Sequence, residues 1–347
     1  MYTARYQKYV MNFIHPGGTS RGVMYNRTSW FLILKDGPFT GIGECAPLDG
    51  LSRDNVSDIE KTLDWVCLNI NNGDLLDEPS LWQFPSILFA LETAFLDVKN
   101  AGKRLIFDND FFKGKSGIQI NGLIWMSDVY DMRIQVKQKI NEAFDCIKIK
   151  ISSANIDNEL AFIKEIRNTY GNNIEIRVDA NGAFTFENCK KILDKLAALK
   201  VHSIEQPIPS GEFLANAEIC RNSPIPIALD EDIIHWDDQY NKYELLDKIK
   251  PQYVILKPGL LGGFKETTEW INLAVQRNIG WWITSALESN IGLNAIAQYT
   301  ANWEIELKQG LGTGKVFDNN IQSPLKIVNG AIIYDTLEMW DLKNLNI

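Results

Sequence analysis

Six polar residues recur at a nearly constant spacing through the second half of the chain. Each one ends or directly follows a short apolar run, at intervals of 25 to 29 residues: Lys150, Asp179, Glu205, Asp230, Lys257 and Ser285. One strand and one helix with their loops take about this many residues, so the same structural position returns on successive strands. If these strands close into a parallel barrel, their carboxyl ends meet at one face and the six groups converge there.

The three carboxylates of this set predict a metal site. Asp179, Glu205 and Asp230 would lie on three adjacent strands. Carboxylates held close together repel one another, and burying them without compensation is very unfavourable. A divalent cation removes that conflict, and ligation by oxygen without Cys or His favours a hard ion. Each carboxylate taken singly could instead cap the helix that follows it. All three in register favour Mg²⁺, with Mn²⁺ as a substitute.

Lysines flank the carboxylates in the order of the strands. Strict alternation in IKIKI (147–151) predicts a strand with Lys148 and Lys150 on one face. Lys257 ends the strand after Asp230, so it should face Lys150 across the mouth of the barrel. A lysine beside a metal suits removal of a proton α to a carboxylate, because the metal stabilises the enediolate as it forms. Lys148 should lie deeper and pair with a metal-ligand carboxylate or touch a substrate carboxylate.

The elements that must position these groups change in type along the chain. The first hundred residues predict strands and then helices, which is an α+β arrangement. The expected strands cover 3–14 and 23–35, joined by the loop HPGGTSRG, with a further strand after Gly37-Pro38. The expected helices start near Ser52 and run over 86–100.

From about residue 117 short apolar runs alternate with amphipathic helical segments. There are eight such runs: 118–123, 146–151, 174–179, 201–205, 225–230, 253–257, 281–285 and 305–310. This alternation predicts right-handed βαβ units and a (β/α)₈-type barrel. An open doubly wound sheet is the alternative, but NGLIWMSD after the first run lacks a GxGxxG phosphate turn. Residues 311–330 are rich in Gly, Asn and Asp, so we expect no eighth helix.

Composition excludes several classes of protein. The net charge of −9 argues against nucleic acid and anionic membrane surfaces as partners. We find neither an apolar run of about 18 residues nor the apolar core of a secretory signal at the start. The five cysteines are scattered, which predicts reduced thiols and a cytoplasmic protein. The chain has three histidines, which makes a histidine-based zinc site or a Ser-His-Asp triad an unfavoured interpretation.

The motifs at the strand ends resemble those of the enolase superfamily, in its lysine-type, muconate-lactonising-like branch. They follow the order of that branch along the chain: Lys148-Ile-Lys150, Asp179-Ala-Asn181, Glu205-Gln-Pro207, Asp230-Glu231, and Lys257-Pro258 with Gly262-Gly263. The resemblance implies a modified (β/α)₇β TIM-type barrel over 116–315. It also implies an N-terminal α+β capping domain over 1–115, completed by the tail 316–347. Asp179, Glu205 and Asp230 would bind Mg²⁺, with Lys150 as the acid/base lysine.

The resemblance also implies residues that contact the substrate, a small anionic carboxylate. Lys148, Asn181 and Ser285 would line its site. The glycine-rich first-domain loop would close over it, helped by a second loop near 48–53. Arg21 in the first loop would recruit the anion, although a solvated loop arginine is an equal interpretation. Asp232 stands where the family often has Ser, which affects the support of the metal ligands rather than the ligands themselves.

Within the superfamily the chain is most similar to members that dehydrate a succinyl-substituted cyclohexadiene carboxylate to an aromatic acid for menaquinone biosynthesis. The similarity rests on TSALESNIGLNAIAQ and GLGTGKVFDNN after the last strands. Gly310-Leu-Gly312-Thr-Gly314 lacks the acidic D-x-D of dipeptide epimerases, and Ser285-Ala-Leu-Glu288 differs from the glycine-rich seventh strand of N-succinylamino-acid racemases. Lys257 would act by its charge or as a second acid/base.

Other functions stay open at this point. Within the superfamily the alternatives are an N-succinylamino-acid racemase and a muconate-type cycloisomerase. A Schiff-base lyase would also use a barrel lysine, but it does not need three carboxylates in register. A non-catalytic binding module has no reason to hold both lysines. A homo-oligomer is compatible with the sequence, which does not specify the oligomeric state.

Overall fold

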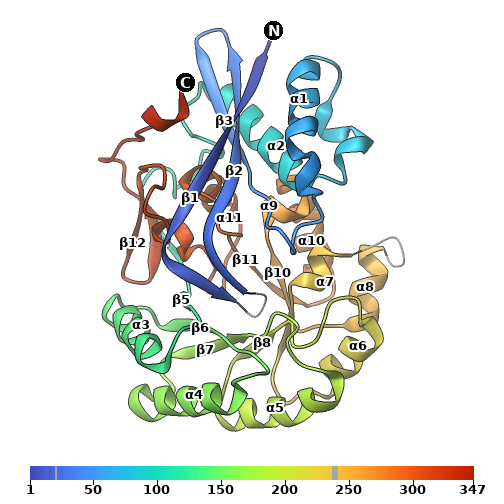
Figure 1. Cartoon of the computed structure of the whole chain (residues 1–347), viewed down its shortest axis with the longest axis vertical. Helices are drawn as coiled ribbons and strands as arrows, with labels where there is room; N and C mark the ends of the chain where they lie inside the picture. The colour runs from blue at the N-terminus through green and yellow to red at the C-terminus, as the bar shows by residue number, and fades with distance from the viewer. Residues whose placement is uncertain (20–21, 237–240) are drawn as a thin grey trace.

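The N-terminal part of the chain forms a three-stranded antiparallel sheet (Figure 1). The computed structural model describes residues 1–19, 22–236 and 241–347. The strands are β1 (Thr3–Thr19), β2 (Gly22–Asp36) and β3 (Phe39–Cys45). The hairpin of β1 and β2 is longer than predicted, because a register shift between Asn12 and Gly17 lets pairing resume as far as Thr19 and Gly22. Most of the predicted loop 15–22 is therefore strand.

Two helices pack beside this sheet. They are α1 (Ile59–Asn69) and α2 (Pro85–Lys99), joined through the 3₁₀ turns Leu75–Asp77 and Pro79–Leu81. Helix α2 lies close against β3 because Gly41 and Gly43 have no side chain. A Cβ on Gly43 would lie 1.8 Å from the carbonyl oxygen of Ala90. The sequence therefore permits backbone-to-backbone packing of helix on strand.

The start of the first helix differs from the prediction. A 3₁₀ turn covers Val56–Asp58 and the α-helix begins at Ile59, not near Ser52. The reason is that Asp54 caps the other helix. Its Oδ1 accepts hydrogen bonds from the backbone N–H (3.1 Å) and the hydroxyl (2.6 Å) of Ser86, in the first turn of α2. The first turn has a local cap of its own, since the side chain of Asn55 accepts a hydrogen bond from the backbone N–H of Ser57.

Residues 118–310 form the predicted parallel barrel. Seven strands pair in sequence order: β5 (Gly122–Ile124), β6 (Cys146–Lys150), β7 (Glu175–Asp179), β8 (Ser203–Glu205), β9 (Ile227–Leu229), β10 (Tyr253–Leu256) and β11 (Gly280–Ile283). The eighth predicted strand is reduced to bridges from Gln309 to Ile120 and from Gly310 to Thr284. These bridges link the last strand back to the first, so the sheet closes.

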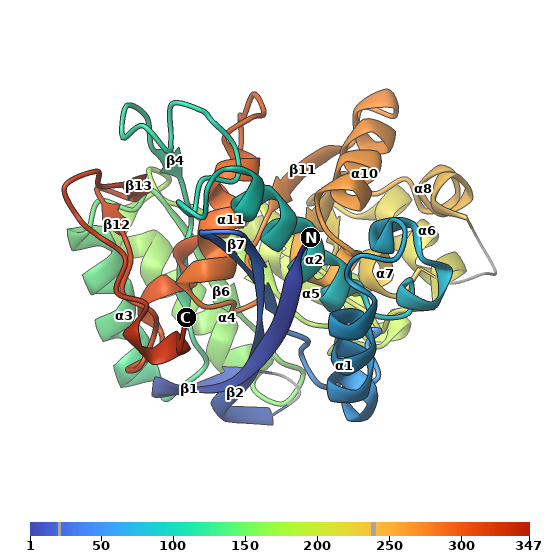
Figure 2. The same cartoon turned by 90° about the horizontal axis from the view of Figure 1, so that it is seen from above.

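Helices cover the outside of the barrel (Figures 1 and 2). They are α3 (Val129–Asn141), α4 (Ile156–Tyr170), α5 (Phe186–Ala198), α6 (Phe213–Asn222), α8 (Lys242–Ile249), α10 (Phe264–Gln276) and α11 (Asn290–Thr300). Two short helices, α7 (Glu231–Ile234) and α9 (Pro258–Leu261), lie instead at the carboxyl ends of the strands, next to the N-terminal domain. From residue 311 to the C-terminus, all of which is described, the helical segments are two 3₁₀ turns, Gly312–Lys315 and Lys343–Leu345. The missing eighth helix was predicted correctly, and the fold is a modified (β/α)₇β barrel.

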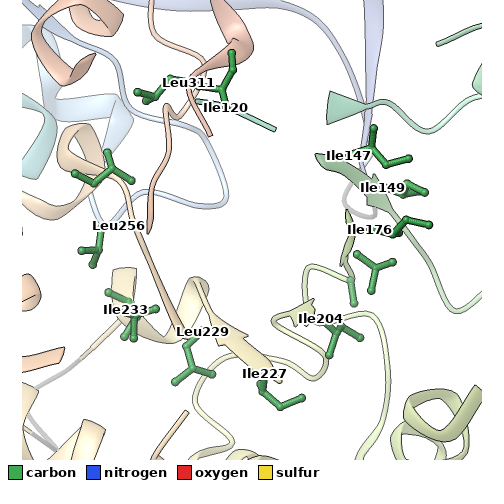
Figure 3. Packing of buried hydrophobic residues seen from close by; sticks show 14 of the residues in the cluster. Ile120, Ile147, Ile149, Ile176, Ile204, Ile227, Leu229, Ile233, Leu256 and Leu311 are labelled. Atoms are coloured by element: carbon green, nitrogen blue, oxygen red, sulfur yellow. The ribbon is translucent and has the colours of Figure 1, made fainter. Parts of the chain in front are cut away.

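The main core lies between the barrel strands and these helices (Figure 3). The alternate residues Ile147 and Ile149 of β6, and Ile151 directly after it, are fully buried in this core. The residues between them, Lys148 and Lys150, must therefore point to the inside of the barrel, because successive side chains on a strand face opposite ways. Apolar packing on one face of the strand thus fixes the direction of the two ammonium groups on the other.

The C-terminal tail contacts both parts of the molecule. Its hairpin of β12 (Leu325–Val328) and β13 (Ala331–Tyr334) pairs with β4 (Ile118–Gln119) at the start of the barrel. The tail also meets β1, where Phe317 bridges to Phe13 and the Tyr9 hydroxyl donates to the carbonyl of Asn319 (2.8 Å). The exact domain boundaries stay a prediction. No helix of the described chain is long and apolar enough to cross a bilayer.

Candidate active site

A cavity opens where the carboxyl ends of the barrel strands meet the N-terminal domain. Most of the predicted site residues line it together: Lys148, Lys150, Asp179, Asn181, Glu205, Lys257 and Ser285. Asp230 is fully buried beside it and accepts a hydrogen bond from Lys257. The N-terminal domain contributes Met24 from β2 and Leu48 and Leu51 from the predicted second loop. Arg21 lies outside the described residues, so its role stays a prediction.

The register of the sheet brings the carboxylates side by side. Asp179 is the direct partner of Glu205, and Glu205 is the partner of Ala228, two residues before Asp230. All three side chains are at most 3% exposed. The equal strand spacing read from the sequence therefore corresponds to one row of buried carboxylates.

The three lysines lie among these carboxylates. Lys148 Nζ is 2.5 Å from Glu205 Oε2 and 3.0 Å from Asp179 Oδ2. Lys150 Nζ lies 3.1 Å from the same Asp179 oxygen and donates to Asn181 Oδ1 at 2.6 Å. Lys257 forms an ion pair with Asp230. Of the two roles predicted for Lys148, the structure has the pairing with carboxylates, those of Asp179 and Glu205, and metal binding by these carboxylates stays a prediction.

Burial and charge together shift the pKa values of these groups. Burial opposes the charge of Lys148, but Asp179 and Glu205 outweigh it and raise its pKa above the ordinary value. Burial likewise opposes the charge of Asp179, yet Lys148 and Lys150 hold its pKa well below the usual range. Burial, with the neighbouring Asp179 charge, raises the pKa of Glu205 to about 8. Burial opposes the charge of Lys257 as well, but the negative charge of Asp230 outweighs this effect, so the pKa of Lys257 is raised.

The carboxylates can accommodate a divalent cation. Glu205 Oε1 and Asp230 Oδ1 are buried and have no hydrogen-bond partner within the described chain. Buried oxygens left without donors are unfavourable, and a cation would satisfy them. The donors are all carboxylate oxygens, which suits a hard ion such as Mg²⁺. The described residues contain no ready-made cluster of three ligands, so the carboxylate side chains would turn from the lysines to the ion.

Residues next to the carboxylates hold their strand ends in place. Gln206 has a left-handed backbone (φ 37°), and its side-chain oxygen accepts from the backbone N–H of Asp230 at 3.1 Å. Its amide nitrogen donates to Asp232 Oδ2 at 2.9 Å. Asp232 also accepts from Asn216 (2.8 Å) and from the backbone N–H of Gly211 (2.8 Å). Asp232, the departure from the family pattern, therefore supports the loop that follows Glu205.

Asn181 joins Lys150 to the opposite loop. Its backbone is left-handed (φ 45°), a conformation that asparagine tolerates better than most residues. The side chain accepts from Lys150 and donates to Glu231 Oε1 at 3.1 Å. It therefore orients the ammonium group of Lys150, and its predicted contact with substrate stays a prediction.

Ser285 lies at the cavity edge, but its hydroxyl is already bonded. The Ser285 hydroxyl donates a hydrogen bond to Glu288 Oε2 at 2.6 Å. Its oxygen accepts hydrogen bonds from the Thr313 hydroxyl at 2.7 Å and from the backbone N–H of Leu287 at 3.1 Å. These contacts leave the hydroxyl of Ser285 no proton for a substrate. Direct binding by this hydroxyl stays a prediction that the geometry does not favour.

Sequence reasoning missed the other wall of the cavity. It is formed by Asn121, Leu123 and Trp125 from the first strand, and by Trp282 and Thr313. The inward residues of the first strand alternate in IQINGLIW, and that period-two pattern was the available signal. The second predicted loop is held on the barrel by His235, whose Nε2 lies 2.6 Å from the carbonyl oxygen of Leu51.

Comparison with known proteins gives consistent results. Residues 131–336 match the family model described as Enolase C-terminal domain-like. The chain is 40% identical to an o-succinylbenzoate synthase from Desulfotalea psychrophila, over 94% of this chain and 97% of that protein. The crystal structure of MenC from Desulfotalea psychrophila LSv54 superposes with a TM-score of 0.85 and 36% identity, covering 96% of this chain and 99% of that one.

A more distant structure shares the fold. A dipeptide epimerase from Enterococcus faecalis V583, solved with Mg and the dipeptide L-Leu-L-Tyr, superposes with a TM-score of 0.83 at 17% identity, covering 95% of this chain and 96% of that one. This level of identity shows the fold alone. The family model and the Desulfotalea relative confirm the predicted family: the chain belongs to the enolase superfamily.

Proposed function

We propose that the chain is an o-succinylbenzoate synthase. It would convert 2-succinyl-6-hydroxy-2,4-cyclohexadiene-1-carboxylate to 2-succinylbenzoate and water, a step of menaquinone biosynthesis. The observation that carries this proposal is the pair Lys150 and Lys257 on opposite sides of one cavity, with the three buried carboxylates beside them. The extent and level of identity with the Desulfotalea synthase support it.

Lys150 would perform both proton transfers. In its neutral form Nζ takes the proton on the ring carbon that bears the carboxylate. The resulting ammonium then gives a proton to the hydroxyl on the adjacent carbon, which leaves as water while the ring becomes aromatic. Both groups lie on the same face of the ring, so one lysine suffices. Asn181 and Asp179 accept hydrogen bonds from Nζ and so direct it.

The remaining groups would stabilise negative charge. Mg²⁺ held by Asp179, Glu205 and Asp230 would stabilise the charge that develops on the ring carboxylate. Lys257 is paired with Asp230, and its raised pKa keeps it protonated at neutral pH. It would therefore act as a fixed positive charge near the ring, by Coulomb attraction or by a cation–π contact.

The experiment compares wild type with Lys150→Ala and Lys150→Arg. Wild type with Mg²⁺ should form the aromatic product and exchange the α-proton of substrate with D₂O. Both variants should lose at least 100-fold in kcat and in exchange, since general acid–base catalysis contributes about 10²–10⁴-fold. The proposal would be contradicted if wild type formed no aromatic product, or if both variants formed it at a rate within tenfold of wild type. Inactivation by borohydride with substrate in EDTA would instead indicate a Schiff-base lyase.

An N-succinylamino-acid racemase is the second candidate. It is favoured by the same opposed lysines, since racemisation needs an acid/base group on each face of the substrate. The chain is 26% identical to an N-succinylamino acid racemase from Amycolatopsis over 58% of this chain. The ion pair of Lys257 with Asp230 disfavours a proton-accepting role. Incubation with an N-succinyl-L-amino acid in D₂O separates the two candidates. A racemase should exchange the α-proton of this amino acid and form its D isomer at a rate comparable with that of the dehydration, whereas a synthase should not.

A further inference from the structure

The cavity has two chemically different walls. The strands β6 to β10 supply the three lysines and the carboxylates, with Lys150 and Lys257 at the two ends of this row of strands. The rest of the lining on the barrel side comes from β5, from the end of β11 and from the segment after Gln309, and none of these residues is charged. We call it the uncharged wall: Asn121, Leu123, Trp125, Trp282, Thr284, Ser285, Gly310, Gly312 and Thr313.

The hydroxyl groups of the uncharged wall are committed to partners inside the protein. Thr284 donates to the carbonyl of Gly310 at 2.9 Å, and Thr313 donates to Ser285 at 2.7 Å. Ser285 in turn donates to Glu288. A ligand could receive a hydrogen bond from one of these hydroxyls only if an internal bond were broken.

Asn121 differs from these neighbours. The residue is 5% exposed, and its side-chain Oδ1 is buried without a partner in the part of the chain that the structure describes. Its backbone, by contrast, is firmly placed, since the N–H donates to the carbonyl of Gln309 at 2.9 Å and the next residue, Gly122, pairs with Ile147. A fixed backbone thus holds, at the wall of the cavity, an amide whose oxygen has no partner among the described residues.

An amide in that state is suited to a ligand. Buried polar groups without partners are destabilising and are few in folded proteins, so each one needs an explanation. The Asn121 amide oxygen forms no hydrogen bond within the described chain, so rotating the amide by 180° costs no hydrogen bond of that oxygen. The side chain can therefore present its N–H₂ group to a ligand in the cavity. The other amide on the cavity, Asn181, has both ends bonded, to Lys150 and Glu231.

We propose that the Asn121 amide is a substrate-binding group that donates a hydrogen bond to an oxygen of the succinyl arm. The inference rests on the proposed function. In that function the ring carboxylate lies at the lysines and metal-binding carboxylates, so the arm on the adjacent ring carbon extends toward the uncharged wall. The arm offers acceptors only, a ketone and a carboxylate, and Asn121 supplies the donor that the committed hydroxyls do not.

The test measures binding of two ligands to the Mg²⁺-loaded protein by calorimetry. One ligand is the product 2-succinylbenzoate, and the other is benzoate, which has the ring carboxylate without the arm. Asn121→Leu removes the donor at similar volume, and Asn121→Asp replaces it with an acceptor of the same shape. Both variants should bind 2-succinylbenzoate about 10- to 100-fold more weakly, the range expected for a hydrogen bond to a charged oxygen. Binding of benzoate should not change.

Thr284→Val is the matched control, because it removes a hydroxyl of the same wall whose proton is already committed to Gly310. It should leave the ratio of the two affinities unchanged. Thermal unfolding checks that each variant is folded. If Asn121→Leu does not fold, the isosteric variant Asn121→Asp alone supplies the comparison with wild type. A wild-type chain that forms no 2-succinylbenzoate refutes the proposed function and the inference with it. An active wild type with unchanged affinities in both Asn121 variants, or an equal loss for benzoate, refutes the inference alone.

Discussion

Replacement of Lys148 by methionine should make the stability of this protein depend on a divalent cation. The ammonium group of Lys148 lies 3.0 Å from Asp179 and 2.5 Å from Glu205, and the lysine side chain is 12% exposed. Methionine keeps most of the side-chain volume and removes the charge. The variant then holds two buried carboxylates that have lost their shared partner.

The magnitude follows from burial. Removing one partner of a buried ion pair typically costs about 3–5 kcal/mol, because the other charge stays buried without compensation. The full cost applies only where Glu205 is ionised in the wild type. Burial and the Asp179 charge raise the pKa of Glu205 above its usual range while Lys148 opposes that rise, so the loss should grow as Glu205 ionises at higher pH. We therefore expect a loss of up to about 3–5 kcal/mol at pH 9 and a smaller loss at pH 7.

Urea unfolding in EDTA and in excess Mg²⁺ measures this effect. Mg²⁺ supplies positive charge at the same carboxylates, so it should stabilise the variant more than the wild type and remove most of the difference. Lys195→Met is the matched control, because Lys195 forms a 3.0 Å pair with Asp157 while its side chain is 55% exposed. A surface pair of this kind contributes about 0–1 kcal/mol, without dependence on Mg²⁺.

Two outcomes would refute this reasoning. Equal stability of Lys148→Met and Lys195→Met in EDTA at pH 9 would mean that Lys148 does not compensate the carboxylates. A large loss that Mg²⁺ leaves unchanged would mean that the cation does not bind where Lys148 acts.

Three further predictions concern other groups. Lys257→Arg should keep measurable dehydration and Lys257→Ala should lose most of it, because arginine keeps the charge but cannot accept a proton; equal inactivity of both, with α-proton exchange retained, would assign Lys257 as a second acid. Asp179→Asn, Glu205→Gln and Asp230→Asn should each weaken Mg²⁺ binding, measured by calorimetry, and lower kcat steeply; unchanged affinity and activity in one of them would remove that residue from the metal site. Asp54→Asn should gain stability relative to wild type by about 2–3 kcal/mol as the pH rises from 4 to 7 in urea unfolding. The reason is that burial raises the pKa of Asp54 to about 6 in the folded state, whereas in the unfolded state the carboxyl has its midpoint near pH 4 and therefore ionises first. A difference that does not change with pH would contradict the buried-carboxyl explanation.

The positions of the charged groups could be predicted from the sequence because a closed parallel sheet leaves little freedom. Once the strand ends recur at the spacing of one βα unit, closure of the sheet brings them to one rim. The observed register, with Lys150 opposite Asp179 and Asp179 opposite Glu205, is the direct expression of that spacing. Alternation on β6 similarly determined which of its residues face inward.

Contacts between distant segments could not be predicted in this way. Asp54 lies two residues after the expected start of the first helix, yet its side chain bonds to Ser86 in the first turn of α2. The choice depends on how the first domain packs. The commitment of the Ser285 hydroxyl to Glu288 depends likewise on which neighbours lie within hydrogen-bond distance. The same holds for Asn121, whose Oδ1 has no partner among the residues that the structure describes. Residue type and spacing do not contain that information.

The two lysines of β6 show how one strand can hold groups with different tasks. One oxygen, Asp179 Oδ2, lies 3.0 Å from Lys148 and 3.1 Å from Lys150, so a single carboxylate reduces the repulsion between the two ammonium groups. Lys148 has a second carboxylate partner in Glu205, which strengthens its hold on the proton. Lys150 has instead the neutral amide of Asn181. The deeper lysine is therefore held by two carboxylates and the one nearer the mouth by one carboxylate and one amide. This difference supports the prediction that Lys150, rather than Lys148, is the lysine that transfers the proton.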